Sequence, residues 1–453
     1  MKTTSSLVAL GLSVLISLPC AAQVTLEEAN QLQGSLTPLG AKRAGNAEGT
    51  IPPWEGGLTT MPPGYELGKH MVHPFPDDEI IFKITRDNLD QYRDKLTPGQ
   101  QAMFERYPET YRMNIYQSRR TSALPDDAYD KVFQNALNAR LTDDGNGVVG
   151  FDEIIPFPIP QNGLEAIWNH LIRYRGRSLS RDIVQAVVRE SGAYTLIHLA
   201  DEAVYPINME GHDPEADSNI LVYFKQITTA PARLTGNQTL VQDTINQVIE
   251  PRRAWIYNAG QRRVRRAPQV AYDGPGTASD GLRTVDNFDM FSGAPDKYNW
   301  ELKGKREIYI PYNNFTLASN TLRYADIIKP GHLNPDVLRY ELHRVWVVEA
   351  TLKDNERNIY GRRTFYIDED SWQIAAADYY DNRNNLWRVA EGFHVQFYYA
   401  DTPYYAAEAV YDLLASQYIV LGLFNESDAP PRFGFTANKM DYTPAALRRS
   451  GIR

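Results

Sequence analysis

From about residue 190 onward the chain is a series of short apolar and alternating runs separated by Gly, Asn, Asp and Pro. Such runs predict strands, and the short turns between them predict antiparallel pairing, because a parallel crossover needs a dozen or more residues. The segment 406–424 is ambiguous, since it opens like a helix after Thr402-Pro403 and ends in the strand-like SQYIVLGLF. The clearest strand candidates are hairpins at 254–267, 339–368 and 371–393, followed by a strand at 394–399.

The preceding region carries helix signals instead. Thr97, Pro98 and Gln100 have the spacing of an N-cap, an N1 proline and a capping-box residue, and they predict a helix that stops at Pro108. A second helical run covers about 126–141, and IIFKIT predicts one short strand before both.

Residues 23–68 are dense in Gly, Pro and short polar residues, which predicts an irregular arm lying on the main body with Trp54 as its anchor. We therefore expect four parts: a signal peptide at 1–22, this arm, a helical or mixed region at 69–190, and an antiparallel β domain at 191–453. The fold class is α+β, with a large curved antiparallel sheet that carries a few helices.

The first 22 residues have the form of a secretory signal peptide. Lys2 supplies a positive start, residues 7–18 an apolar run, and Cys20-Ala21-Ala22 the small residues of a cleavage site, so we expect the mature chain to begin at Gln23. A membrane anchor is disfavoured because the apolar run is short. Acylation of Cys20 is disfavoured because Pro19 precedes it.

Cys20 is the only cysteine, so the mature chain would have no disulfide, thiolate metal site or cysteine nucleophile. No second apolar run is long enough to cross a bilayer, so we expect a soluble protein that works outside the cytoplasm. Removing the leader takes away Lys2 and no acid, so the net charge of −9 becomes −10, which argues against nucleic-acid binding. The 28 tyrosines favour a β architecture with aromatic walls.

The segment 142–153 aligns with a calcium-binding loop of the EF-hand type. Asp144, Asn146 and Glu153 fall on ligand positions, but Thr142 replaces the first aspartate. The required exiting helix is also missing, because IIPFPIP follows Glu153. The sequence therefore favours a solvated turn, and we expect no bound metal and no cofactor.

Six arginines crowd one predicted hairpin of this acidic chain. They could be solvated edge-strand charges that prevent aggregation, or they could dock an acidic partner or an anionic head group. The candidate docking residues are the four at its second strand: Arg262, Arg263, Arg265 and Arg266.

The histidines give no clear sign of catalysis. Glu341 and His343 share one strand face with Glu349, and a structural hydrogen bond is the favoured interpretation. His170, in WNHLIRYRG, is also interpreted as structural. No nucleophile elbow, zinc-protease motif, phosphate-binding loop or dinucleotide fingerprint occurs, so no catalytic residue is assigned and a non-enzyme is favoured.

Bulky apolar residues alternate along the predicted strands and mark one side of each. If that side faces a cavity, it would form the wall of a ligand site; the alternative is a closed protein core. The candidate ligand-binding residues are Trp255, Tyr257, Trp346, Val348, Phe365, Ile367, Trp372 and Ile374.

The chain resembles the proteobacterial envelope family called domain of unknown function 1329. The segments that carry the resemblance include LTPLGAKRAGNAEGTIPPWEGG, KLTPGQQAMFERYPETYRM, PFPIPQNGLEAIWNHLIRYRG, PRRAWIYNAGQRRVRRAPQVAYD, WELKGKREIYIPYN and RYELHRVWVVEATL, and they span nearly the whole mature chain. This family is placed with the LolA/LolB-like proteins. The resemblance implies an antiparallel half-barrel closed by helices over an apolar cavity. It also implies a periplasmic carrier of lipids or lipoproteins, serving an RND-type exporter and an outer-membrane protein.

Three functions remain open from the sequence. A carrier of a lipophilic ligand is favoured, and it requires an apolar cavity. A hydrolase of envelope lipids or glycans would require titratable groups that converge in a cleft. A non-enzymatic assembly or scaffold protein requires neither feature.

Overall fold

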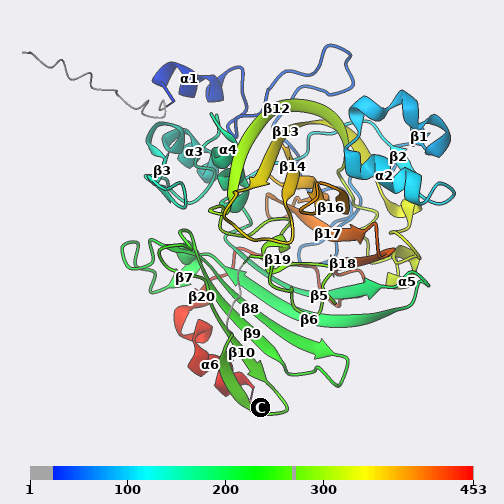
Figure 1. Ribbon diagram of the computed structural model, residues 1–453. Coiled ribbons are helices and arrows are strands. Elements are labelled where there is room, and N and C mark those ends of the chain that lie inside the picture. The colour runs from blue at the N-terminus through cyan, green and yellow to red at the C-terminus, as the bar shows by residue number, and fades with distance from the viewer. Residues whose placement is uncertain (1–23, 268–271, 452–453) are drawn as a thin grey trace, which may run out of the picture.

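The computed structural model describes residues 24–267 and 272–451, so the predicted signal peptide lies outside the described residues. Its main feature is a sixteen-stranded sheet that curves over itself at one end (Figure 1). Its long ladders are antiparallel, which confirms the α+β class with a large curved antiparallel sheet. No described helix combines the length and apolar character needed to span a bilayer.

One half of the sheet is a meander in which each strand pairs with the next along the chain. It includes all the hairpins predicted beyond residue 300, and it resolves the ambiguous segment 406–424 into parts of two strands. The strands of this upper half are β13 (Tyr340–Leu352), β14 (Arg362–Asp368), β15 (Ile374–Tyr380), β16 (Leu386–Phe397), β17 (Thr402–Asp412) and β18 (Gln417–Leu423).

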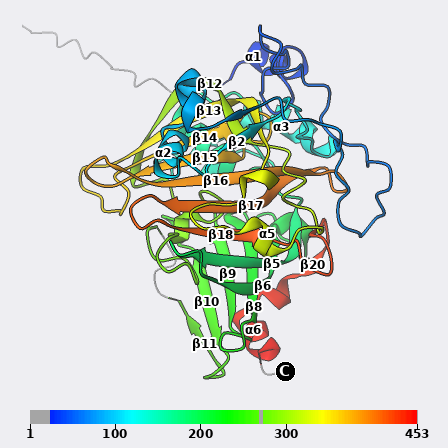
Figure 2. The ribbon, with the colours of Figure 1, turned by 90° about the vertical axis from the view of Figure 1, so that its right-hand side faces the viewer.

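The other half continues from β18 into strands that come earlier in the sequence (Figure 2). The predicted hairpin at 254–267 forms its free edge. The sheet also takes in residues before 191, because the first strand of this lower half pairs with both β18 and its own successor. The strands are β5 (Ser178–Val188), β6 (Tyr194–Val204), β8 (Ile220–Ala230), β9 (Gln238–Thr244), β10 (Arg253–Asn258) and β11 (Arg263–Arg266).

Further strands complete the architecture. Four join the main sheet: β1 (Phe82–Ile84), β2 (Met113–Ile115), β12 (Tyr298–Pro311) and β19 (Arg432–Phe433). In Figure 1, β12 arches with β13 over the upper half. Two separate pairs are β3 (Arg140–Leu141) with β4 (Val148–Val149), and β7 (Met209–Glu210) with β20 (Ala437–Asn438).

The helices lie around this sheet. The capping box of Thr97 and Gln100 starts a helix as the sequence predicts, and Pro98 stands in its first turn. The α-helices are α1 (Leu26–Asn30), α2 (Pro98–Arg106), α3 (Asp126–Asn138), α4 (Gly163–Leu171), α5 (Tyr324–Ile327) and α6 (Pro444–Ser450). The 3₁₀ helices are η1 (Gln31–Gln33), η2 (Arg86–Gln91), η3 (Arg93–Lys95), η4 (Pro206–Asn208), η5 (Val285–Asn287), η6 (Pro335–Val337) and η7 (Lys439–Tyr442).

Helix α4 fills the inner side of the upper half. It packs against β12 and β13, and all but one of its residues are buried. The two ring nitrogens of His170 lie 3.1 and 2.9 Å from the carbonyl oxygens of Trp372 and Asp289. Burial holds the pKa of His170 well below its ordinary value. This histidine is structural, as the sequence suggested.

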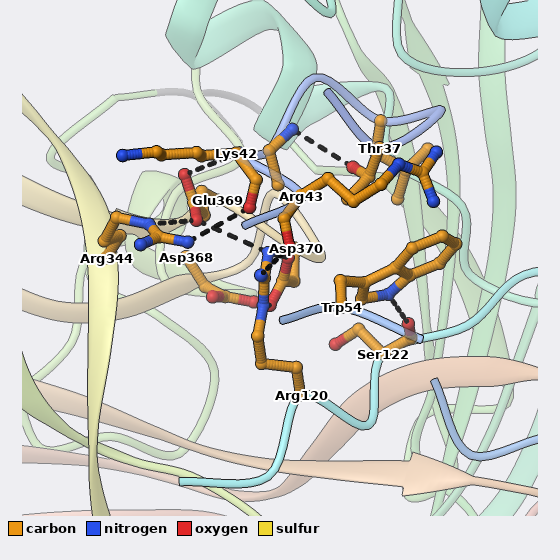
Figure 3. Close-up of polar contacts among 12 residues, drawn as sticks. Thr37, Lys42, Arg43, Trp54, Arg120, Ser122, Arg344, Asp368, Glu369 and Asp370 are labelled. Carbon is orange, nitrogen blue, oxygen red and sulfur yellow. Dashed lines mark hydrogen bonds and ion pairs between the residues drawn. The ribbon is translucent and has the colours of Figure 1, made fainter. Parts of the chain in front are cut away.

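The N-terminal arm is held by a buried acidic turn between β14 and β15 (Figure 3). Glu369 pairs with Arg344 at 2.7 Å and also accepts from the backbone N–H of Lys42 at 3.3 Å. Trp54 contributes as predicted, because its indole N–H donates to the carbonyl of Ser122 at 3.4 Å. The arm is therefore fixed by hydrogen bonds to buried charged side chains as well as by apolar packing.

Asp378 in β15 is a fully buried carboxyl that joins α2 to the sheet. It accepts from the backbone N–H of Gly99 at 3.1 Å and from the hydroxyl of Tyr366 at 3.2 Å. Gly99 allows this approach, since a Cβ there would lie 2.1 Å from the carboxyl oxygen. Burial raises the pKa of Asp378 to about 7 despite these hydrogen bonds.

We predict that Asp378→Asn, which keeps the shape and hydrogen bonds, becomes more stable relative to wild type as the pH rises from about 4 to about 7. The unfolded carboxyl ionises near its ordinary pKa while the folded one is still protonated, so wild type loses stability through this window. The loss cannot exceed about 1.4 kcal/mol per pH unit. Denaturant unfolding of both proteins across the window measures it, and a constant difference between them would contradict the assignment.

Candidate functional site

A cavity of about 180 Å³ lies on the inner face of the lower half of the sheet. Strands β5, β6, β8 and β9 form its wall. Residues 276–292, between β11 and β12, cover it, and we call them the roof segment. The space between wall and roof is the sheet cavity.

Two cross-strand rows make the wall, because the registers align residues of the same face on neighbouring strands. One row is apolar and the next is polar. The apolar row is Leu179, Ala203, Phe224 and Val241. The polar row is Arg181, Asp201, Gln226 and Thr239.

The roof segment adds apolar side chains opposite this wall. The ring of Phe288 lies 5.6 Å from that of Phe224, and Val285 also lines the cavity. Phe224, Val241, Val285 and Phe288 are only half-buried, so they keep apolar surface accessible between wall and roof. Such a surface is typical of a site for an apolar ligand.

Asp289 fixes the roof segment in place. Its carboxylate pairs with Arg173 and, at 2.6 Å, with Arg175, both just beyond α4. Burial alone would raise the pKa of Asp289, but the two guanidinium groups hold it well below its ordinary value. A second anchor is the pair of Asp286 with Arg363 of β14, at 2.7 Å.

The roof segment also has a side that faces away from the cavity. Phe291 packs against Phe365 of β14 and Trp300 of β12, with ring centroids 5.4 and 5.5 Å apart. The hydroxyl of Tyr379 donates to the carbonyl of Met290 at 3.2 Å. The roof segment therefore packs into the core of the upper half with one side and covers the sheet cavity of the lower half with the other.

The polar groups of the wall are already paired. Arg181 bonds Asp201 at 3.0 Å, and Arg252 bonds Asp243 at 2.6 Å. These pairs satisfy buried charges at the margin of the apolar surface, as buried ions require. The charged side chains of the wall are thus neutralised in pairs, and they border an apolar space.

A second space, of about 410 Å³, adjoins the sheet cavity and shares Gln226, Thr239 and Thr277 with it. It continues across β9 to Ile256 of β10, which is 43% exposed. The cross-strand pairs extend the polar row beyond Thr239, first to Ile256 and then to Arg265 at the sheet edge. Together the two spaces form a groove that crosses the sheet.

The eight residues that the sequence proposed as ligand contacts lie elsewhere. None of them lines the sheet cavity. Trp346 is half-buried and stacks on Trp372 with centroids 6.1 Å apart. The five fully buried residues of the upper core are Val348, Phe365, Ile367, Trp372 and Ile374.

The remaining two, Trp255 and Tyr257 of β10, face α6 on the opposite side of the sheet from the cavity. The Tyr257 hydroxyl donates to the carbonyl of Gly451 at 2.5 Å. The physical reason is the same for all eight residues: other segments of the chain cover them, and the strand pattern alone does not show which segments these are. The covering segments are α4, Phe291 of the roof segment, the N-terminal arm and α6. Their contact with a ligand remains a prediction that this arrangement does not favour.

The four candidate docking arginines are exposed, and they lie in β11 and the turn before it. Strand β11 pairs only with β10, so it is a sheet edge. No ion pair joins Arg262, Arg263, Arg265 or Arg266 to another described residue within 4.0 Å. The interpretation as edge-strand charges and the interpretation as a docking surface both fit this placement.

A buried polar centre lies inside the curl of the upper half. His343 lies 2.9 Å from Glu341, which confirms the hydrogen bond expected from the sequence. His343, Asp368 and Asp370 offer ligand atoms within 4.8 Å of one another. Arg120 already binds Asp370 through two hydrogen bonds of 2.8 and 2.6 Å, and its positive charge opposes a cation there.

The first half of the calcium-like segment, residues 142–147, is the turn of the hairpin between β3 and β4. Thr142 donates to Asp144 at 2.6 Å, so these groups bond each other. Glu153, in the place of the bidentate ligand, pairs with Lys131 at 2.6 Å and with Arg177 at 2.5 Å. No described helix begins at this point. The geometry agrees with the solvated turn that the sequence favoured.

Comparison with known proteins identifies the family. The family described as "Protein of unknown function (DUF1329)" matches residues 83–448. The chain belongs to the DUF1329 family. An uncharacterized protein of Pseudomonas aeruginosa is 52% identical over 455 residues, covering 100% of both chains.

Two solved structures are similar to parts of this chain. A DUF1329 family protein from Desulfovibrio piger is 14% identical, with a TM-score of 0.42, over 60% of this chain and 92% of that one. A LolA superfamily protein from Nitrosomonas europaea is 11% identical, with a TM-score of 0.38, over 63% of this chain and 98% of that one.

The wall of the sheet cavity in this DUF1329 chain was missed by the sequence interpretation. Strands β6 and β8 carry apolar residues on both faces, so alternation alone does not mark an inner side. The signal that distinguishes the faces is the register. Only the pairing of Ala203 with Phe224, and of Phe224 with Val241, reveals a continuous apolar row.

Proposed function

We propose that this protein is a carrier that binds a lipophilic ligand in the sheet cavity. The observation that carries the proposal is the accessible apolar row of the wall, which faces Phe288 of the roof segment. Burying apolar area is worth about 25 cal/mol per Å², so a ligand chain lying on this row would gain affinity from each group it covers.

The ion pairs around the cavity support a carrier over a hydrolase. A hydrolase needs carboxylates or histidines free to take up or release protons at the substrate. Asp201, Asp243 and Asp289 are each held by an arginine instead. The sequence resemblance to LolA/LolB-like proteins points in the same direction, and the signal peptide predicted at 1–22 supports the proposal that the protein acts in the periplasm.

The variant Ala203→Trp tests the carrier proposal, because Ala203 stands in the middle of the apolar row and a tryptophan there fills the space. The expected result is a loss of binding of a fluorescent fatty-acid analogue by at least about tenfold, with the thermal stability kept. The matched control is Ala200→Trp on the same strand, whose side chain is on the opposite face, next to Asp182 and Ile227.

Three results would contradict the carrier proposal. The wild-type protein could bind no lipophile, in which case the assembly or scaffold function replaces it. Ala203→Trp could bind as well as wild type. Alternatively, Ala200→Trp could lose binding to the same extent, which would show that the ligand does not occupy the inner face.

We also propose that the exposed arginines of β11 dock an acidic surface of an envelope partner. Arg265 ends the polar row that crosses the groove, so a partner bound there would lie where the groove reaches the sheet edge. An RND-type exporter and an outer-membrane protein are the partners that the resemblance implies.

The double variant Arg263→Glu with Arg265→Glu is expected to lose a partner that wild type retains from an envelope extract, and added salt should weaken that retention. The control is Arg86→Glu with Arg383→Glu, which makes the same charge change at two exposed positions away from this edge. Equal loss with both pairs would contradict a specific docking surface.

A further inference from the structure

Arg283 of the roof segment is a cation without a counter-ion in the sheet cavity. Four arginines line the cavity, and three of them are paired with its three aspartates. No ion pair or side-chain hydrogen bond joins the guanidinium of the fourth, Arg283, to any other residue that the structure describes. The cavity therefore has one surplus positive charge.

This guanidinium is buried rather than solvated. Arg283 is 7% exposed, and its Nε has no hydrogen-bond partner. The group lies over the ring of Phe288, with Cζ 5.6 Å from the centroid, and it packs against Gly276, where a Cβ would lie 3.0 Å from Cζ. Burial lowers the pKa of Arg283, although the charge of Glu408 opposes the shift.

The roof segment holds Arg283 in this position. Its carbonyl accepts from the backbone N–H of Gly276 at 2.8 Å and from the hydroxyl of Ser279 at 3.1 Å. The carboxylate of Glu408 accepts from the N–H of Met290 at 2.9 Å and makes no ion pair with Arg283. A buried charge left unpaired is costly, and an arginine fork matches the oxygens of a carboxylate or a phosphate.

We infer that the ligand of the sheet cavity is an amphiphile with an anionic head group, and that Arg283 binds that head group. The apolar tail then lies along the row that contains Ala203, beside the contact between Phe224 and Phe288. The inference rests on the proposed carrier function and adds the chemical class of its ligand. A fatty-acid carboxylate and a phospholipid phosphate share the required chemistry.

Competition against a fluorescent fatty-acid analogue tests this inference with probes of equal chain length. Wild type is expected to bind palmitate at least about tenfold more tightly than hexadecanol, which has the same tail and no charge. Lysophosphatidate with a palmitoyl chain is the phosphate arm, and the tighter of the two acids identifies the head group. Inorganic phosphate alone should not compete.

The variant Arg283→Met is expected to lose the preference for palmitate over hexadecanol while hexadecanol binding stays the same. Arg283→Lys keeps the charge without the fork. Its preference for palmitate over hexadecanol should be smaller than that of wild type and larger than that of Arg283→Met. Arg383→Met, at an exposed turn, is the control and should bind like wild type. Ligand-free Arg283→Met should unfold at the same or a higher temperature than wild type, because it removes an unpaired buried charge.

The outcomes separate this inference from the carrier function. Equal binding of palmitate and hexadecanol by wild type overturns the inference and leaves the carrier function standing. Binding of neither probe overturns both. A preference for palmitate that survives in Arg283→Met, or a large loss of stability in ligand-free Arg283→Met, would each overturn the role of Arg283. Competition by inorganic phosphate alone would overturn the inference that the ligand is an amphiphile.

Discussion

The ion pairs of Asp289 with Arg173 and Arg175 are the constraint on which the candidate site depends. They bind the roof segment to the residues that follow α4. The roof segment is thereby held between the two halves of the sheet and contacts both. The pairs are buried, and breaking a buried pair by removing one partner typically costs about 3–5 kcal/mol. The roof is therefore a fixed part of the fold, and the space beneath it has a defined shape.

That one segment explains why the two halves of a continuous sheet differ. On its upper side Phe291 completes a closed core with Phe365 and Trp300, so bulky strand residues there meet protein. On its lower side Phe288 contacts Phe224 of the wall, with ring centroids 5.6 Å apart, and the half-buried apolar side chains beside this contact still line the sheet cavity. A filled core and a ligand space thus follow from the two faces of the same roof segment.

The sequence was sufficient for much of the fold, because its signals there are local. The capping box of Thr97 and the hairpins at 339–368 and 371–393 depend on residues close together in the chain, and all of them form. The candidate site was not predictable in this way. Because of their size, Trp255 and Tyr257 were preferred over Ile256 as ligand contacts. However, α6 covers the face of β10 that carries these two aromatic residues, and Ile256 on the other face lines the groove. Which face of a strand is covered depends on segments distant in sequence.

The central claim is that a lipophile occupies the lower half of the sheet, beneath the roof segment, and not the aromatic core of the upper half. A crystal structure of the protein with a fatty acid brominated at its chain end tests this most directly, since the anomalous signal locates the bromine. The account predicts a single peak in the groove, beside the rings of Phe224 and Phe288 or further along toward Ile256. A peak beside Trp346 and Trp372, or a crystal grown with the ligand that contains no peak, would contradict it.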